Sequence, residues 1–290
     1  EIKFNVFLKE ALALGADFVA TGHYCRKIIH DDGNHGLLSG LDPEKDQSYF
    51  LCQVRQSQLQ KALFPIGGLK KAEVRTIALA QGIHTADKKD SQGLCFVGKI
   101  SLPTFLQQQL APKQGAVIEI PEDLQQFSDY NAISNTLDHV VALSEPFSYD
   151  GSMGEPVTTH QGAHYYTVGQ RKGLHIGGRP KPSFVLATDT KENIIYSGQT
   201  DEHPGLYHRA LRLAKEEVNW IQTPSEAMLE TGLECSIRIR YRQPLQKGIL
   251  IKKEGTLYLW FETPQRGITP GQFAAWYNGD ELLGSGVISN

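Results

Sequence analysis

Residues 16–24 are Ala-Asp-Phe-Val-Ala-Thr-Gly-His-Tyr, a short apolar run that ends in a polar tripeptide. The run has the length of a buried strand, and a helix is predicted further on, over 70–81, where Gly82 stops it. Alternating helix and strand signals are typical of an α/β layer. In open α/β sheets ligands bind at the carboxyl ends of the strands, so Gly22 and His23 are expected to lie at such an edge.

The character of the sequence changes twice along the chain, which predicts three domains. The α/β layer is expected over 1–101, a mainly β domain over 102–205 and a small antiparallel β-barrel over 206–290. The barrel is favoured by strand-length apolar runs and by the Asn278-Gly279 pair, which suits a hairpin turn. In the middle domain the predicted strands are 116–120, 140–143, 165–168 and 184–187, and the acidic stretch 121–138 is predicted to be a loop or insertion.

Composition excludes several classes of protein. The 290 residues are 40% hydrophobic and 21% charged, which argues against disorder, and no apolar stretch approaches the ~20 residues of a membrane-spanning helix. Lys and Arg number 29 against 32 Asp and Glu, and the net charge of −3 taken alone disfavours a nucleic-acid partner. Four cysteines without a C-x-x-C pair argue against a disulfide framework, so a cytoplasmic location is expected. Because the first residue is Glu1 and not Met, we expect the chain to be part of a longer protein.

One cysteine has the surroundings of a reactive thiol. Cys95 lies in a glycine-flanked loop close to two lysines at 88–89, and nearby cations favour the nucleophilic thiolate. The alternative is a buried loop cysteine without chemistry. Of the other three cysteines, Cys52 and Cys235 are expected to be buried, and Cys25 is undecided.

Two basic segments could meet a phosphate backbone. In a strand over 235–242, period-two geometry would place Arg238, Arg240 and Arg242 on one face. Such a row suits RNA or DNA, but it is equally consistent with a solvated face neutralised by cross-strand carboxylates. The glycine-rich loop 169–178, which contains Arg and Lys, has the freedom for close approach to a phosphate.

Two further patterns have structural explanations. His160 and His164 are four residues apart, as metal ligands on a helix would be, but a strand is predicted there and no carboxylate motif accompanies them, so no metal site is expected. Lys45-Asp46-Gln47 could simply begin a helix, with Asp46 near the positive end of its dipole.

Read together, seven motifs in fixed order resemble the tRNA-specific 2-thiouridylases over almost the whole chain. They are Glu1-Ile2-Lys3-Phe4, Ala20-Thr21-Gly22-His23-Tyr24, Lys45-Asp46-Gln47-Ser48-Tyr49-Phe50, Lys89-Asp90-Ser91-Gln92-Gly93-Leu94-Cys95-Phe96, Tyr166-Thr167-Val168-Gly169-Gln170-Arg171-Lys172-Gly173, Arg240-Tyr241-Arg242 and Thr269-Pro270-Gly271-Gln272.

The resemblance implies a fold, a reaction and a set of site residues. The fold would be part of an adenine-nucleotide alpha-hydrolase-like (PP-loop ATPase) domain, a mainly β central domain and a C-terminal antiparallel β-barrel. ATP, with Mg²⁺, would adenylate O2 of the wobble uridine in the Lys, Glu and Gln tRNAs, and a persulfide on Cys95 would deliver sulfur to C2. The sulfur would come from a cysteine desulfurase or a relay of small carriers. Gly22 would line the nucleotide site, and the tRNA contacts would be His23, Lys45, Asp46, Gln47, Arg240, Tyr241 and Gln272.

Two motifs of this family are not in the sequence. The Ser-Gly-Gly-x-Asp-Ser pyrophosphate loop and the Asn-Pro-Asp-x-x-Cys-Asn motif, whose cysteine would form a disulfide with Cys95, both belong upstream of Glu1. We therefore expect the isolated chain to be inactive. Two alternatives to a sulfurtransferase follow: a tRNA-binding fragment without catalysis, and a thiol hydrolase that uses Cys95.

Overall fold

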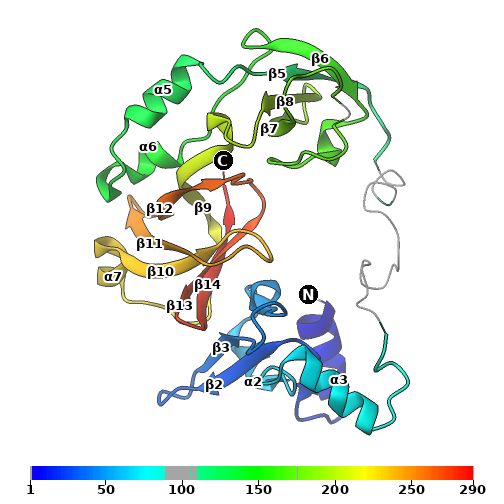
Figure 1. Cartoon of the computed structure of the whole chain (residues 1–290). Helices are drawn as coiled ribbons and strands as arrows, with labels where there is room; N and C mark the ends of the chain where they lie inside the picture. Colours follow the sequence, from blue (N-terminus) through cyan, green and yellow to red (C-terminus); the bar gives the residue numbers. More distant parts are fainter. Residues whose placement is uncertain (1, 89–104, 106–109, 175, 290) are drawn as a thin grey trace. The chain divides into compact units, whose positions relative to one another are not determined.

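The computed structural model describes residues 2–88, 105, 110–174 and 176–289, which divide into two units. The first unit consists of Glu1–Lys88, Arg212–Thr263 and Pro270–Ser289, and so joins the two ends of the chain. The second contains the described residues from 105 to 211 together with Pro264–Thr269. Figure 1 shows the elements of both units coloured along the chain. Among the helices of these described residues, none combines the length and apolar character that membrane crossing needs.

The N-terminal part of the first unit is a small α/β module. Its elements are the π-helical segment η1 (Ile2–Phe7), α1 (Leu8–Ala13), β1 (Val19–Ala20), β2 (Cys25–Ile29), β3 (His35–Ser39), the 3₁₀ helix η2 (Ser48–Leu51), α2 (Gln56–Lys61), β4 (Ala62–Leu63) and α3 (Lys71–Ala80). β1 and β4 pair in parallel, with Val19 opposite Ala62. The helix predicted over 70–81 is confirmed. The buried strand predicted within 16–24 is confirmed only in part, because β1 is two residues long and Ala20 is exposed.

A hairpin in this module connects it to the barrel. Strands β2 and β3 are antiparallel around a tight turn in which Gly33 has a φ of +82°, a conformation that favours glycine. β3 then pairs with β14 (Glu281–Ile288), with Leu37 opposite Leu282. The sheet of the barrel therefore continues into the α/β module.

The C-terminal part of the first unit is a closed barrel of six antiparallel strands. Its order is β13-β10-β11-β12-β9-β14, and pairing of β13 with β14 closes the ring. The elements are β9 (Tyr207–Trp220), α7 (Glu226–Thr231), β10 (Leu233–Arg238), β11 (Gln246–Lys253), β12 (Thr256–Arg266), β13 (Phe273–Asn278) and β14. Residues 207–211 of β9 and 264–266 of β12 are counted with the second unit. The predicted barrel and its last hairpin are confirmed, with Gly279 and Asp280 as the two loop residues between the paired Asn278 and Glu281.

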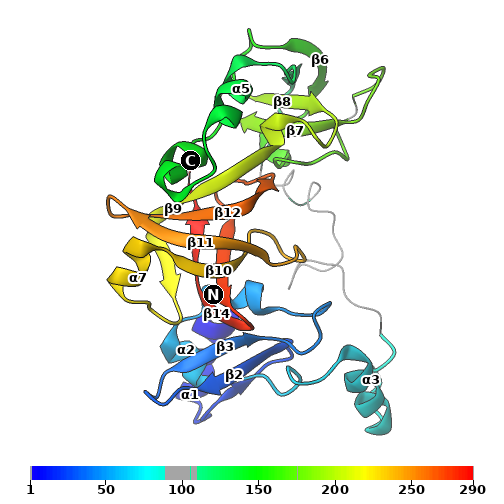
Figure 2. The ribbon, with the colours of Figure 1, turned by 60° about the vertical axis from the view of Figure 1, so that its left-hand side comes forward.

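One hydrophobic core serves both parts of the first unit. Leu37 and Cys52 from the α/β module pack in the same cluster as Tyr277 and Leu282 from the barrel, and each of these side chains is at most 2% exposed. Figure 2 shows β2, β3 and α2 beside the strands of the barrel. Burial of this apolar surface, at roughly 25 cal/mol per Å², holds the α/β module against the barrel.

The second unit is a four-stranded sheet with short helices. Its elements are β5 (Gly115–Glu119), α5 (Gln125–Ala132), the 3₁₀ helix η3 (Leu137–His139), α6 (Val140–Ser144), β6 (Glu155–His160), the 3₁₀ helix η4 (Ala163–Tyr165), β7 (Ser183–Asp189), β8 (Ile194–Gln199) and the 3₁₀ helix η5 (Pro204–Leu206). The strand order is β6-β5-β8-β7, with β5 and β8 parallel. The strands predicted at 116–120 and 184–187 are confirmed.

Three predictions for this unit are wrong. Residues 140–143 form a helix because Val140 and Leu143 are both buried, which i,i+3 spacing on a helix allows. The loop predicted over 121–138 is wrong for 125–132, which form α5 with Phe127 and Tyr130 buried, whereas the alternative of an insertion stays a prediction. Residues 165–168 are not a strand; the chain there leaves η4 in irregular turns.

Candidate functional site

The loop after β1 begins with an open glycine. Gly22 is exposed, and no heavy atom lies within 4 Å of the place where a Cβ would stand. It follows the parallel pair of β1 and β4, whose register continues with the Thr21 N–H donating to the Leu63 carbonyl at 2.9 Å. The predicted position of Gly22 at the carboxyl end of a parallel strand is therefore confirmed.

His23 is held as a neutral imidazole. Its Nδ1 lies 2.9 Å from the Thr21 hydroxyl, and its ring packs against those of Phe4 and Phe64, at centroid distances of 5.9 and 6.5 Å. Burial, assisted by the charge of Lys3, lowers the pKa of His23 to about 4. At neutral pH this side chain can stack or share a hydrogen bond, but it adds no positive charge for a phosphate.

Asp46 is buried and fully engaged within the protein. Its Oδ1 accepts hydrogen bonds from the backbone N–H groups of Gly40 at 3.1 Å and Ser48 at 3.0 Å. Its Oδ2 accepts from the Ser48 hydroxyl at 3.1 Å and from Nη1 of Arg238 at 2.9 Å. The Asp46 side chain is 4% exposed and that of Arg238 12% exposed, so this is an internal ion pair between the α/β module and β10.

Gln47 makes the corresponding link to the loop after β1. Its backbone N–H donates to the Tyr24 carbonyl, and its side-chain Oε1 accepts from the Tyr24 N–H, both at 3.1 Å. The two neighbours Asp46 and Gln47 therefore fix one segment to two places: the barrel strand that ends at Arg238, and the loop that carries Gly22.

The predicted arginine row is wrong in its geometry. β10 ends at Arg238, the chain bends after it, and Arg242 has a φ of +67° in the turn that follows. A hydrogen bond from the Ile239 N–H to Oε1 of Gln243, at 3.1 Å, closes this turn. The three arginines consequently do not share a strand face, and Arg238 is neutralised by Asp46 instead of by a cross-strand carboxylate.

A groove of about 630 Å³ joins several of the predicted tRNA-binding residues. It is lined by Pro43, Glu44, Lys45, Asp46, Arg238, Tyr241, Arg242, Gln243, Pro244 and Leu245. Arg240 precedes Tyr241 in the bend. Gln272 precedes β13, where the carbonyl of Phe273 accepts a 2.8 Å hydrogen bond from the Tyr49 hydroxyl. The folding of residues 45–47 against 238–242 could not be read from the sequence, because no local pattern relates segments so far apart.

The described cysteines are unsuited to nucleophilic chemistry. Cys25, Cys52 and Cys235 are buried free thiols. Burial raises the pKa of all three, to about 11 for Cys52 and about 12 for Cys235, so each stays protonated at neutral pH. The expected burial of Cys52 and Cys235 is confirmed, and Cys25 joins them. Cys95 lies outside the described residues.

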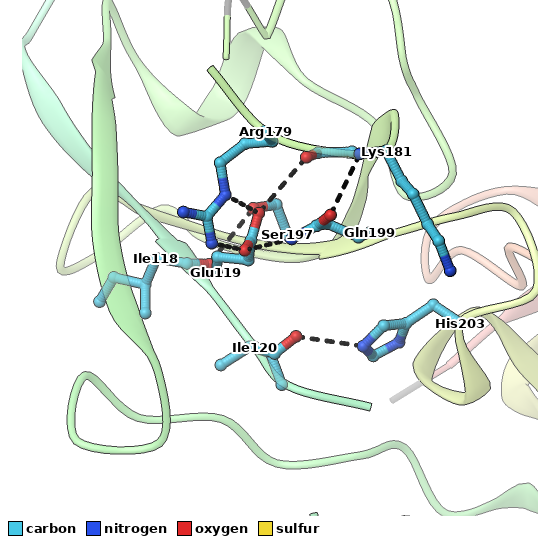
Figure 3. Close-up of polar contacts among 9 residues, drawn as sticks. Ile118, Glu119, Ile120, Arg179, Lys181, Ser197, Gln199 and His203 are labelled. Atoms are coloured by element: carbon cyan, nitrogen blue, oxygen red, sulfur yellow. Dashed lines mark hydrogen bonds and ion pairs between the residues drawn. The ribbon is translucent and has the colours of Figure 1, made fainter. Parts of the chain in front are cut away.

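The second unit contains a polar pocket that sequence analysis did not predict. Its volume is about 620 Å³, and Glu119, Arg179, Gln199 and His203 are among its lining residues. Glu119 is buried, forms an ion pair with Arg179, and accepts a 2.9 Å hydrogen bond from Nε2 of Gln199 (Figure 3). Nε2 of His203 lies 3.1 Å from the Ile120 carbonyl. These contacts satisfy the buried carboxylate internally.

Two other predicted features also lie in the second unit. Both ring nitrogens of His160 are engaged, with the Asn193 carbonyl at 3.2 Å and the Gly162 N–H at 2.9 Å. Over the described part of the chain, no three His, Cys, Asp or Glu side chains gather as metal ligands would. The glycine-rich loop 169–178 is anchored to β7 by a 2.7 Å hydrogen bond from the Gly169 N–H to the Val185 carbonyl.

Three family models match this architecture and define the class of protein. They are described as a tRNA methyl transferase HUP domain over residues 1–99, a tRNA methyl transferase PRC-barrel domain over 135–199 and an aminomethyltransferase beta-barrel domain over 211–288. In chain order, these three models correspond to the PP-loop-type domain, the mainly β domain and the β-barrel that were expected from the sequence.

Relatives that match the whole chain identify the family. A tRNA-specific 2-thiouridylase of Christiangramia forsetii is 53% identical over 100% of this chain and 74% of its own length. That of Flavobacterium johnsoniae is 51% identical with the same coverage, and that of Chlamydia trachomatis is 43% identical over 99% of this chain and 69% of its own length. The chain belongs to the tRNA-specific 2-thiouridylase family.

Proposed function

We propose that this chain is the larger part of a tRNA-uridine 2-sulfurtransferase that thiolates the wobble uridine of tRNA at the expense of ATP. The observation that carries the proposal is the double attachment of the segment 45–47. Asp46 bonds to Arg238 near the barrel residues Arg240 and Tyr241, and Gln47 bonds to the loop that carries Gly22. A substrate that lies on the barrel would therefore also reach the nucleotide-side loop.

In this proposal the domains divide the work. Residues 1–101 belong to the ATP-binding catalytic domain, 102–205 to a central domain and 206–290 to a tRNA-binding barrel. The residues proposed to act in tRNA binding are His23, Lys45, Asp46, Gln47, Arg240, Tyr241 and Gln272. Because the Asp46 carboxylate is buried and already bonded, we propose that it acts by placing Lys45 and Arg238, since a carboxylate would repel a phosphate directly.

The residues present fit one wall of an ATP site. Gly22 is exposed at the end of a parallel strand with open space beside it, which allows a nucleotide to approach the backbone closely. ATP, as its magnesium complex, would convert uridine O2 into part of a good leaving group. The contribution of this chain would be to position the tRNA and to supply the nucleophilic sulfur.

We propose Cys95 as the carrier of that sulfur. The terminal sulfur of its persulfide forms a bond to C2 of the uridine, and AMP leaves with the former O2. A second cysteine thiolate then attacks Sγ of Cys95. The electron pair of the broken S–S bond goes to the sulfur that stays on C2, the two cysteines remain as a disulfide, and a thiol reductant restores them. The sulfur would reach Cys95 from a cysteine desulfurase or a relay carrier.

The test is mass spectrometry of tRNA nucleosides after reaction of the complete protein with ATP, a persulfide source and a thiol reductant. We expect 2-thiouridine from the unmodified protein and from Cys235→Ala, which removes a buried, protonated thiol. Cys95→Ala should abolish the product. If its yield were unchanged, Cys95 would not be the carrier.

A second candidate, a tRNA-binding module without catalysis, applies to the chain taken by itself. It is favoured because the chain spans 74% of the length of its relatives in Christiangramia and Flavobacterium. We expect this chain alone to bind tRNA, with an affinity that falls steeply as salt is raised, and to form no 2-thiouridine. Thiolation by the chain alone would exclude this candidate. The alternative of a thiol hydrolase that uses Cys95 stays a prediction, and so does the cytoplasmic location of the protein.

A further inference from the structure

Two aromatic rings from distant parts of the sequence meet beside the groove, which one of them, Tyr241, lines. Phe50 belongs to η2, and Tyr241 to the bend after β10, yet their ring centroids are 4.1 Å apart with an angle of 36° between the planes. Phe50 is nevertheless 56% exposed. Most of one large ring is therefore left open to solvent beside the proposed tRNA-binding residues.

The backbone holds Phe50 in this outward position. The neighbour on one side, Tyr49, donates its hydroxyl to the carbonyls of Phe273 at 2.8 Å and Ile239 at 3.2 Å. The neighbour on the other side, Leu51, is 4% exposed and lies in the core. Because both neighbours point inward, η2 must project Phe50 outward. Such a ring loses little conformational freedom when a partner packs against it.

Cations lie close to the two rings, although one of them, Arg238, is paired with Asp46. The guanidinium carbon of Arg242 lies 5.5 Å from the centroid of the Tyr241 ring, and Lys45 and Arg238 line the adjoining groove. Exposed aromatic rings next to cations are the means by which proteins hold unpaired nucleotides, because each base stacks on a ring while its phosphate meets a cation.

We propose that Phe50 and Tyr241 form a stacking platform for one unpaired nucleobase of tRNA. The base stacks on the open face of Phe50, Tyr241 supports that ring from behind, and Arg242 lies within reach of a neighbouring phosphate. This inference rests on the proposed function and adds to it a residue, Phe50, that selects single-stranded over paired RNA.

The decisive experiment is a double-mutant cycle between ring and base. The probe is a set of anticodon stem-loop RNAs, each with one abasic position in the loop, bound to the full chain with and without Phe50→Ala. With intact RNA, Phe50→Ala should weaken binding by about 5- to 150-fold, the range measured for loss of one base-aromatic stack. At one loop position, the abasic RNA should bind the unmodified chain more weakly by the same factor, and Phe50→Ala should weaken binding of that abasic RNA no further. If the two losses of affinity multiplied at every abasic position, the platform would be overturned.

Three further variants separate stacking from other roles. Phe50→Leu keeps an apolar side chain without a ring and should bind as weakly as Phe50→Ala, whereas Phe50→Trp should bind at least as tightly as the unmodified chain. Recovery of binding by Phe50→Leu would overturn the proposal. Phe18→Ala is the matched control, because Phe18 is also 50% exposed with a cation, Lys61, 5.5 Å from its centroid. It should bind within about twofold of the unmodified chain.

Failure of this inference can be distinguished from failure of the proposed function. If the unmodified chain binds the stem-loop and Phe50→Ala binds it equally well, the platform is wrong and the proposed function stands. If the unmodified chain does not bind the RNA at low salt, both are wrong. Because Phe50 is 56% exposed, its substitutions should lower the urea midpoint of the first unit only slightly, through loss of the contact with Tyr241.

Discussion

The ion pair between Asp46 and Arg238 offers the sharpest test of how the two parts of the first unit are joined. The perturbation is Asp46→Asn, Arg238→Met and the double variant. Asn keeps an oxygen that can accept the two backbone hydrogen bonds now made to Oδ1 of Asp46. Met keeps an apolar side chain near the Tyr277 ring, whose centroid lies 5.8 Å from the guanidinium carbon of Arg238. Charge is therefore the main quantity that changes.

The expected magnitude follows from burial. Removing one partner of a buried pair typically costs about 3–5 kcal/mol, because the remaining charge has no counterpart. The Arg238 side chain keeps 12% exposure, so we expect the lower end, about 3 kcal/mol, for Arg238→Met. Asp46→Asn should cost about 2–3 kcal/mol. The double variant should cost no more than Arg238→Met alone, which gives a coupling energy of about 2 kcal/mol or more.

The assay can be confined to the first unit. All three tryptophans of the chain, Trp220, Trp260 and Trp276, belong to this unit. Urea unfolding followed by tryptophan fluorescence therefore reports its stability separately from the second unit, which avoids treating a two-unit chain as one transition.

An exposed pair in the same unit supplies the control. Nζ of Lys252 lies 2.7 Å from Oε2 of Glu226, but the two side chains are 31% and 69% exposed. Its coupling energy should be about 0–0.5 kcal/mol, as for surface pairs. If the coupling between Asp46 and Arg238 were as small as that of the control pair, the argument that this pair is an internal connection would be refuted.

Three further predictions use other residues. Gly67→Ala should prevent stable folding of the first unit, because a Cβ there would collide with the Cys25 carbonyl, whereas Gly68→Ala, with no heavy atom within 4 Å, should leave the urea midpoint unchanged. Burial lowers the pKa of His208 to about 4, so between pH 6.5 and about pH 4 the unfolded chain binds a proton at this residue and the folded chain does not. The free energy of unfolding of the second unit should therefore fall by up to about 3 kcal/mol over this pH range, and unfolding followed by circular dichroism should show a smaller fall for His208→Leu. Arg242→Asn, which tolerates the left-handed φ of +67°, should reduce the slope of log tRNA affinity against log salt by about one, and an unchanged slope would mean that Arg242 meets no phosphate.

Local sequence signals recovered the elements whose packing is also local. The helix over 70–81 and the parallel strand before Gly22 needed only apolar spacing and a stop signal. The β2–β3 hairpin was missed although Asp32-Gly33 between two apolar runs indicated a turn. α5 was missed because polar residues dominate 121–138, and its buried face consists of only two aromatic side chains, Phe127 and Tyr130.

The arrangement of the candidate site could not be predicted in the same way. Asp46 and Arg238 are separated by 192 positions, and neither residue's own neighbourhood indicates a buried partner. Period-two reasoning placed three arginines on one strand face, but β10 ends at the first of them because the chain turns before Pro244. The family resemblance named the residues on both sides of the groove, and only the fold showed that they meet.

The net charge of −3 is compatible with RNA binding because charges are distributed unevenly. The stretch 121–138 contributes acidic residues and no Lys or Arg, and it lies in the second unit. In the first unit, Arg238 cancels the one buried carboxylate at the groove, so Lys45 and Arg242 face a single remaining lining carboxylate, Glu44. Since charges separated by more than the ~8 Å screening length at physiological salt hardly influence one another, a phosphate at the groove responds to these nearby cations and not to the sum over the chain.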